Sequence, residues 1–283
     1  MAEIDELFEE QAEEKNETGK MTREEWQIKR EEARTEAFNK LEEATESLSD
    51  PKALETYLCV QSRLDRYSVS NALLIAAQMP EATRLADFSY WQSHGASINK
   101  GEHGITILEP REYTRGEGTA GVSYEPKKVF DISQTTSEAK SFKRKPVDEK
   151  KLVKALTKTS PVKLVIDNDL PENVNARFSP EAGNISVRQG LTGDEIFKAL
   201  TQEIEKARTA SADRQCGSFE AVAVSFILCQ RYDVPPPSLP EENPFEGKEP
   251  KDVRRMLKDI RDEANNMSAV MDKALESKNR DAR

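Results

Sequence analysis

The sequence predicts an α+β protein with two domains that follow a helical N-terminal arm. Stretches with apolar residues at helical spacing alternate with short apolar runs typical of strands, such as ITIL and VKLVID. A polar, lysine-rich stretch with few apolar positions separates two such groups of elements. The first 48 residues are rich in Glu, Lys, Arg and Ala, which is typical of a mostly solvated helix.

These changes in composition place an acidic helical arm at residues 1–48, a first domain at 49–135, a linker at 136–160 and a second domain at 161–283. The net charge of −10 is spread unevenly among them. Residues 1–50 hold 7 Lys/Arg and 17 Asp/Glu, a net of −10, whereas residues 51–145 hold 13 and 11, a net of +2. Because the arm carries the acidity, the overall charge does not exclude nucleic acid as a ligand of the first domain.

Several classes of protein are disfavoured by composition. No apolar run approaches the ~20 residues that a membrane-spanning helix needs, and the acidic N-terminus lacks the basic and apolar regions of a signal peptide. Cys59, Cys216 and Cys229 are odd in number and widely spaced, which favours free thiols in a reducing cytoplasm. We therefore expect a cytoplasmic protein without membrane contacts.

The first domain is predicted to begin with two helices and to end with two strands. KALETYLCVQSRLDRY carries leucines at near-helical spacing. SVSNALLIAAQ follows as a second helix, with Ser68 as N-cap and Pro80 beyond its end. ITIL and PKKVFDISQT read as strands joined by a glycine-rich loop.

The second domain is predicted to start with strand VKLVID and a hairpin around residues 180–184. Thr192 and Glu195 form a capping box, which opens the helix that runs through ALTQEIEKAR. GSFEAVAVSFILCQRY is apolar nearly all round, so we expect a buried helix beginning at Ser218. The final segment has a single apolar stripe and predicts a long amphipathic helix.

The capped helix has the frame of a zinc-peptidase motif with its ligands replaced. In H-E-x-x-H, residues i and i+4 share a helix face and bind Zn²⁺ through two imidazoles, while the Glu acts as general base. Here those positions are Gln202, Glu203 and Lys206. Lysine, with an ordinary pKa of ~10.4, is cationic at neutral pH and repels Zn²⁺. We therefore expect a degenerate site without catalytic residues or metal ligands, no cofactor, and loss of the zinc.

Two regions of the chain resemble ArdC-like antirestriction proteins, including the related LtrC-like proteins of mobile elements. Residues 66–110 resemble the N-terminal single-stranded-DNA-binding domain of that family, and KKVFDISQT resembles its closing strand. Residues 161–274 look like its second half, a zincin metallopeptidase-like domain. The matching positions in the first region are Tyr67, Ser68, Asn71, Leu74, Ile75, Gln78, Pro80, Ala82, Thr83, Trp91, Gly95, Lys100, Gly101, Glu102, Gly104, Ile105 and Pro110.

The resemblance implies a single-stranded-DNA-binding protein of a bacterial mobile element, with a role in antirestriction or conjugal transfer. Such binding needs aromatic faces and a basic groove. The residues that we expect to contact DNA are Arg66, Tyr67, Asn71, Gln78, Arg84, Tyr90, Trp91, Lys100, Gly101, His103, Lys127 and Lys128.

Two other functions remain open from the sequence. One is a metallopeptidase with an unusual ligand set drawn from Asp194, Glu203, Glu205 and Glu220. The other is a non-catalytic adaptor that contacts proteins through both domains. The acidic arm is expected to recruit a basic partner or to compete with DNA for the first domain.

Overall fold

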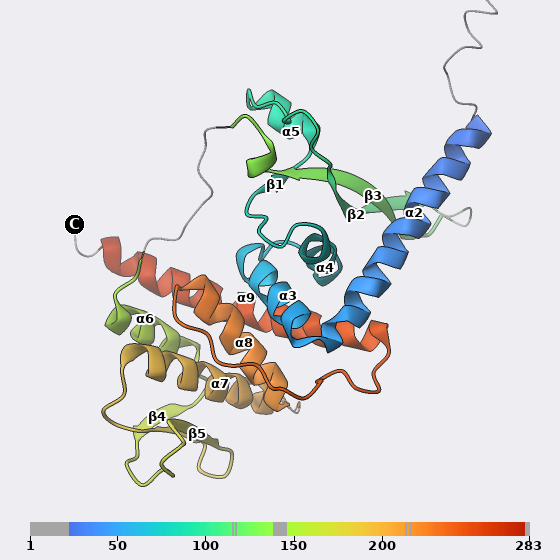
Figure 1. The fold of residues 1–283 in the computed structure, drawn as a ribbon. Coiled ribbons are helices and arrows are strands. Elements are labelled where there is room, and N and C mark those ends of the chain that lie inside the picture. The colour runs from blue at the N-terminus through green and yellow to red at the C-terminus, as the bar shows by residue number, and fades with distance from the viewer. Residues whose placement is uncertain are drawn as a thin grey trace, which may run out of the picture.

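The fold is known from a computed structural model that describes residues 23–114, 116, 118–137, 146–212, 214 and 217–280. Helices dominate, and two small three-stranded sheets lie at different places on the molecule (Figure 1). The mixture confirms the predicted α+β class. Within the described residues, no helix combines the length and apolar character needed to cross a bilayer.

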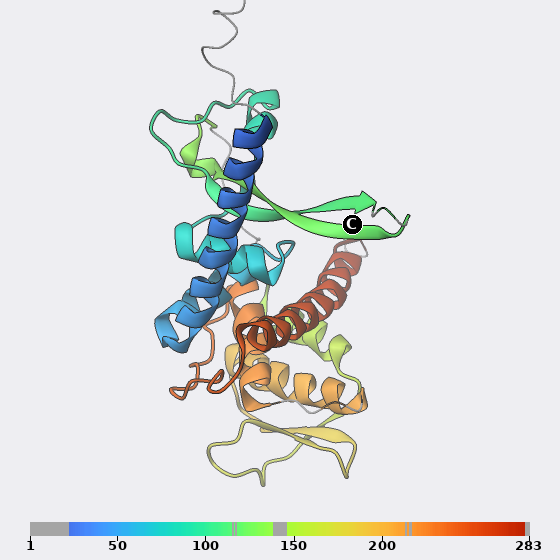
Figure 2. The same ribbon diagram turned by 90° about the vertical axis from the view of Figure 1, so that its right-hand side faces the viewer.

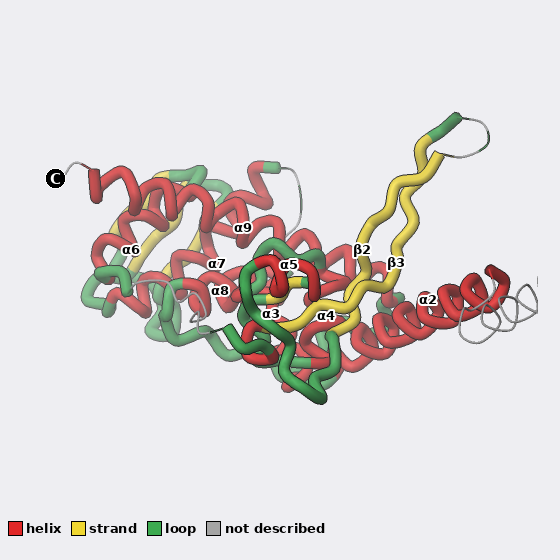
Figure 3. The backbone as a smooth tube through the Cα atoms, turned by 90° about the horizontal axis from the view of Figure 1, so that it is seen from above, coloured by secondary structure: helices red, strands yellow, loops and turns green. Residues whose placement is uncertain are grey.

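The N-terminal half contains helices α2 (Arg23–Glu46), α3 (Pro51–Arg63), α4 (Val69–Gln78) and α5 (Phe88–Ser93). Its sheet has the order β1-β3-β2, with β1 at Leu85–Ala86, β2 at Ile105–Thr114 and β3 at Ala120–Asp131, all antiparallel. Short 3₁₀ helices lie at Ser47–Ser49 and Ile132–Gln134. Strands β2 and β3 form a long hairpin that projects from the helices (Figures 2 and 3).

The C-terminal half begins with helix α6 (Glu149–Leu156) and the 3₁₀ helix Thr157–Thr159. Its sheet has the order β4-β6-β5, in which β4 (Lys163–Ile166) is parallel to β6 (Asn184–Val187) and β5 (Ala176–Ser179) is antiparallel to it. Helices α7 (Gly193–Ser211), α8 (Ser218–Arg231) and α9 (Pro250–Arg280) complete it. The predicted capping box at Thr192 and the predicted start of the buried helix at Ser218 are both confirmed.

One hydrophobic core runs through both halves. Helix α8 lies inside it, and α9 packs along α8 and reaches the helices of the N-terminal half (Figure 1). Polar contacts reinforce this union: the Arg231 guanidinium donates to the Ser62 carbonyl at 3.1 Å, and Arg261 donates to the Asp65 carbonyl at 3.2 Å. The two halves are therefore packed together rather than joined only by a flexible segment.

Two segments that composition marked as solvated contribute to this core. Helix α2 buries Ala37, Leu41 and Ala44, although its sequence carries no strong apolar stripe. Helix α6, in the segment predicted as linker, buries Leu152 and Leu156. In both cases a few apolar residues at helical spacing are enough for packing, because long charged side chains cover the other faces.

Helix α4 closes the outer edge of strand β2 through two side-chain amides. Asn71 Nδ2 donates to the Leu108 carbonyl at 2.9 Å, and the Leu108 N–H donates to Asn71 Oδ1 at 2.8 Å. Gln78 makes the same pair of bonds with Thr106, both at 2.9 Å. The two amides thus imitate a neighbouring strand, and they satisfy backbone groups that an edge strand leaves open.

We predict that Asn71→Leu destabilises the protein by about 1–3 kcal/mol, because it leaves part-buried N–H and C=O groups of Leu108 without partners. Urea unfolding followed by circular dichroism measures the effect. Lys52→Leu, at an exposed position of α3, is the control and should leave the midpoint nearly unchanged. Equal midpoints for Asn71→Leu and wild type would show that the Asn71 hydrogen bonds to Leu108 do not stabilise the protein.

Candidate functional site

The surface around α5 brings basic and aromatic side chains together. The Tyr90 ring stacks on the His94 ring, with centroids 4.0 Å apart and planes 23° from parallel. Arg84 donates to the Tyr90 hydroxyl at 3.0 Å, and its guanidinium lies 5.7 Å from the Trp91 ring centroid. Phe88, at the start of the helix, is 54% exposed. An exposed aromatic face beside an arginine can stack on a nucleic-acid base.

The loop that follows α5 presents Lys100, Gly101 and His103, all exposed. Gln134 holds this loop, because its side-chain amide donates to Glu102 Oε2 at 2.9 Å and to the His103 carbonyl at 3.0 Å. Gly101 has a φ of +91°, a backbone conformation that residues with a side chain rarely adopt. Hydrogen bonds from Gln134 therefore shape the loop, and the Lys100 and His103 side chains face solvent.

Several of the expected DNA contacts have other partners in the structure. The amides of Asn71 and Gln78 are used by strand β2, as described above. Trp91 is 2% exposed and donates its indole N–H to the Phe130 carbonyl at 3.0 Å. Lys127 lies between Asp87 and Glu109, at 3.0 and 2.8 Å, and these carboxylates raise its pKa. These four residues shape the domain, and their polar groups are not directed at a ligand.

The other expected contacts remain accessible. Arg66, Arg84, Lys100, Gly101, His103 and Lys128 are exposed, and Tyr90 is half-buried within its stack. Tyr67 is also half-buried and packs against the core, so desolvation raises its pKa. Lys128 donates to the Thr106 hydroxyl at 2.7 Å, and desolvation, together with the charge of Lys40, lowers its pKa.

In the C-terminal half, the degenerate motif lies where α7 faces strand β5. Gln202, Glu203 and Lys206 line one pocket together with residues of β5. Lys206 Nζ lies 2.6 Å from Glu203 Oε1, and the Phe178 N–H donates to Glu203 Oε2 at 2.7 Å. Both oxygens of the would-be general base are thereby occupied, one by a lysine of its own helix and one by the backbone of a strand.

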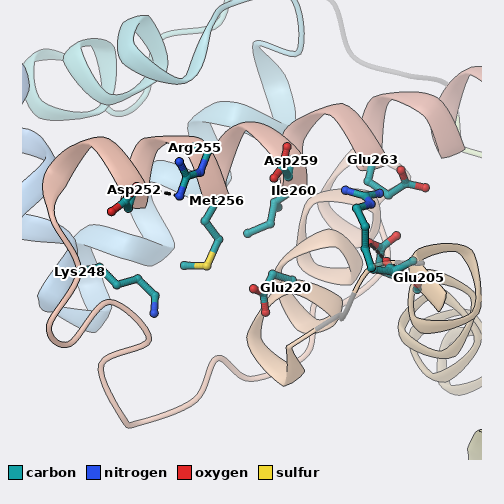
Figure 4. Close-up of a pocket in the computed structure, with 11 residues that line it drawn as sticks. Glu205, Glu220, Lys248, Asp252, Arg255, Met256, Asp259, Ile260 and Glu263 are labelled. Atoms are coloured by element: carbon teal, nitrogen blue, oxygen red, sulfur yellow. Dashed lines mark hydrogen bonds and ion pairs between the residues drawn. The ribbon is translucent and has the colours of Figure 1, made fainter. Parts of the chain in front are cut away.

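The remaining carboxylates of the alternative ligand set lie elsewhere. Glu205 and Glu220 line a second pocket, between α7, α8 and α9 (Figure 4). Asp194 is in the first turn of α7 and lines neither pocket. Within the described part of the chain, no three His, Cys, Asp or Glu side chains are grouped so that they could hold a metal ion.

Glu205 is the most perturbed carboxyl of the second pocket. It is 5% exposed, and among the described residues its Oε2 has no hydrogen-bond partner, whereas Thr209 donates to Oε1 at 3.1 Å. Burial, followed by the charge of Glu263, raises its pKa to about 7. The charges of Arg208 and Arg214 lower the pKa of Glu205, but by less than burial and Glu263 raise it.

This shift predicts stability that depends on pH. The folded protein binds the proton of Glu205 more tightly than the unfolded chain does. The resulting contribution to the free energy of unfolding is complete below pH ~4.5 and is lost as the pH rises through about 7. The expected loss is about 3 kcal/mol, and Glu205→Gln should remove most of it. Thermal melts from pH 5 to pH 8.5 measure this, with exposed Glu246→Gln as control. A wild-type profile as flat as that of Glu205→Gln would contradict the assignment.

Comparison with known structures places the fold. The crystal structure of the antirestriction protein ArdC from plasmid R388 in its Mn(II)-bound form matches with a TM-score of 0.50 and 14% identity, over 74% of this chain and 84% of that chain. The metal-free form of the same protein matches with a TM-score of 0.49 and 13% identity, over 75% and 86%. A sequence comparison with curated proteins gives no match.

The expectation that this chain has no cofactor is corrected by the Mn(II)-bound structure, because that ArdC protein, which has the same fold, is seen with a metal ion. The residues at the three motif positions of this chain do not fit such an ion. The Lys206 ammonium forms an ion pair with the Glu203 carboxylate, and Gln202 offers only an amide as a metal ligand. A cation at this place would have to displace the lysine first.

The N-terminal half is similar to a known domain family. Residues 27–154 match the model of the N-terminal domain of anti-restriction factor ArdC. The match begins inside α2 and ends inside α6, so it includes parts of both segments that composition set apart from the first domain. Over just under half of its length, the chain is therefore similar to the N-terminal domain of anti-restriction factor ArdC.

Proposed function

We propose that this ArdC-like protein binds single-stranded DNA through the surface around α5. The observation that carries the proposal is the stack of Tyr90 on His94, with Arg84 bonded to the Tyr90 hydroxyl and Phe88 exposed at the helix start. Bases of any sequence stack on such faces, and nearby cations attract the phosphates. Lys100 and His103 extend the same half of the molecule with further cationic or polar groups.

In this proposal the protein belongs to a bacterial mobile element and acts in the cytoplasm on transferred DNA, in antirestriction or conjugal transfer. The acidic segment 1–22, which lies outside the described residues, offers a contact for a basic protein partner. Removing residues 1–48 is an unsuitable test of that segment, because it also removes Ala37, Leu41 and Ala44 from the core. A deletion that stops at residue 22 leaves α2 in place.

The C-terminal half, in the same proposal, is zincin-like but does not hydrolyse peptide bonds through Glu203. A general base must accept a hydrogen bond from the water that it activates. Here each oxygen of Glu203 already accepts one hydrogen bond, from the Lys206 ammonium and from the Phe178 N–H, and Lys206 stands where the H-E-x-x-H pattern has an imidazole to hold the metal and its water. The half then serves mainly to pack against the DNA-binding half, through α8 and α9.

We predict that Arg84→Ala combined with Phe88→Ala weakens single-stranded-DNA binding at least about tenfold, because it removes a phosphate contact and a stacking face. Fluorescence anisotropy with a labelled oligo-dT measures this. Arg255→Ala, on the exposed face of α9, is the matched charge control and should bind as the wild type does. Unchanged affinity of the double variant would exclude α5 as the contact surface.

A second prediction tests the zincin-like frame. Gln202→His with Lys206→His recreates two imidazoles one helical turn apart beside Glu203 and frees a Glu203 oxygen. We expect Zn²⁺ affinity at least about tenfold higher than that of the wild type by calorimetry. Gln202→His alone, which keeps the lysine, should gain less. No gain in the double variant would show that α7 does not present these positions as a zincin helix does.

A further inference from the structure

Helix α2 and the projecting hairpin line a groove that was not predicted from the sequence. It is lined by Arg30, Arg34, Arg111, Glu112, Tyr113, Val122 and Ser123. From Glu109 onward, β2 is exposed, and Figure 3 shows the hairpin and α2 projecting from the same side of the molecule. Three arginines against one glutamate make the lining positive, although α2 lies in the acidic part of the chain.

One of these arginines fastens the two walls of the groove. Arg30 donates to both oxygens of Glu125 on β3, through Nε at 2.9 Å and Nη2 at 2.5 Å. A bidentate pair of this kind fixes the orientation of the two side chains as well as the distance between them. Because an isolated hairpin is only marginally stable in water, this contact gives the hairpin a defined position beside α2.

The other two arginines are left for a ligand. The Arg34 side chain is 38% exposed; its guanidinium lies 3.8 Å from Glu31 and 5.9 Å from the centroid of the Phe38 ring. Arg111 is exposed, and its guanidinium has no hydrogen bond or ion pair to any described residue. The opposing walls of the groove therefore each present one cationic fork suited to a phosphate.

Tyr113 provides an aromatic surface in the same groove. It lies directly across the ladder from Gly121, and its ring occupies the space that a side chain at 121 would take: a Cβ there would lie 2.6 Å from Cζ of the ring. The residue is still 45% exposed. The ring is thus supported by the backbone of β3 on one side and accessible on the other.

We propose that this groove is a second contact for single-stranded DNA, in which Arg34 and Arg111 bind phosphates and a base stacks on Tyr113; this inference rests on the proposed function. A single strand offers both an anionic backbone and free base faces, whereas the bases of a duplex are already stacked on each other. An acidic peptide could use the arginines but not the aromatic platform. The groove extends the binding surface from α5 to the opposite end of the sheet.

The test compares Arg34→Ala with Arg111→Ala, as a double variant, and Tyr113→Ala, as a single variant, in the full-length chain. Labelled oligo-dT is titrated at several salt concentrations. We expect the double variant to lose at least about tenfold in affinity and the slope of log K against log salt to become shallower by about 1.4, or 0.7 for each lost phosphate contact. Tyr113→Ala should lose about fivefold or more at every salt concentration, without the change in slope.

Two controls make the outcome specific. Tyr124→Ala removes an equally exposed tyrosine of the same hairpin that does not line the groove, and Arg255→Ala removes a distant arginine. Both should bind as the wild type does, and melting curves should show that all variants are folded.

If the groove variants bind normally while the α5 variant is impaired, this inference fails and the proposed function stands. If the wild type binds no single strand at low salt, both fail. If the groove variants change the oligomeric state and not DNA affinity, the groove is a contact between copies of the chain, which also overturns the inference.

Discussion

The N-terminal half depends on the contact between helix α4 and the outer edge of strand β2. Asn71 and Gln78 satisfy the open backbone groups of Leu108 and Thr106, so the strand needs no further strand beside it. The base of the hairpin is thereby fixed on the helices, while its outer half is left in solvent. The position of the hairpin relative to α2 follows, and so does the groove between them.

The same contact explains why the sequence predicted some features and not others. Asn71 and Gln78 were expected to bind DNA because they match the family pattern. Sequence spacing shows that two amides lie on one face, but it does not show that a strand edge lies opposite. The Ser68 N-cap, the Thr192 capping box and the start of the buried helix were predictable, because their signals are local in the chain.

Features that depend on contacts between distant residues were not predictable in this way. Composition set α2 apart as an acidic arm, yet Arg30 and Arg34 lie four residues apart on the helix and face the hairpin. The i, i+4 spacing of these arginines was a signal that could have marked one basic face. Nothing local to α2 indicated that Glu125, 95 residues away, would hold Arg30.

In the C-terminal half, the structure shows what a lysine does at the last position of the H-E-x-x-H-like pattern. A lysine there supplies no metal ligand, and its ammonium forms an ion pair with the carboxylate of Glu203. Helices α8 and α9 continue the core of the N-terminal half. On α7, Gln202, Glu203 and Lys206 line a pocket, whereas Phe197, Leu200 and Ile204 are buried in the core.

The central claim is that the protein binds single strands through aromatic faces and arginines. It is tested most directly by titrating the wild-type protein against matched single-stranded and double-stranded oligonucleotides at several salt concentrations. We expect tighter binding of the single strand at every salt concentration, with an affinity that falls steeply as salt rises. Equal affinity for the two forms, or an affinity for the single strand that does not change with salt, would contradict it.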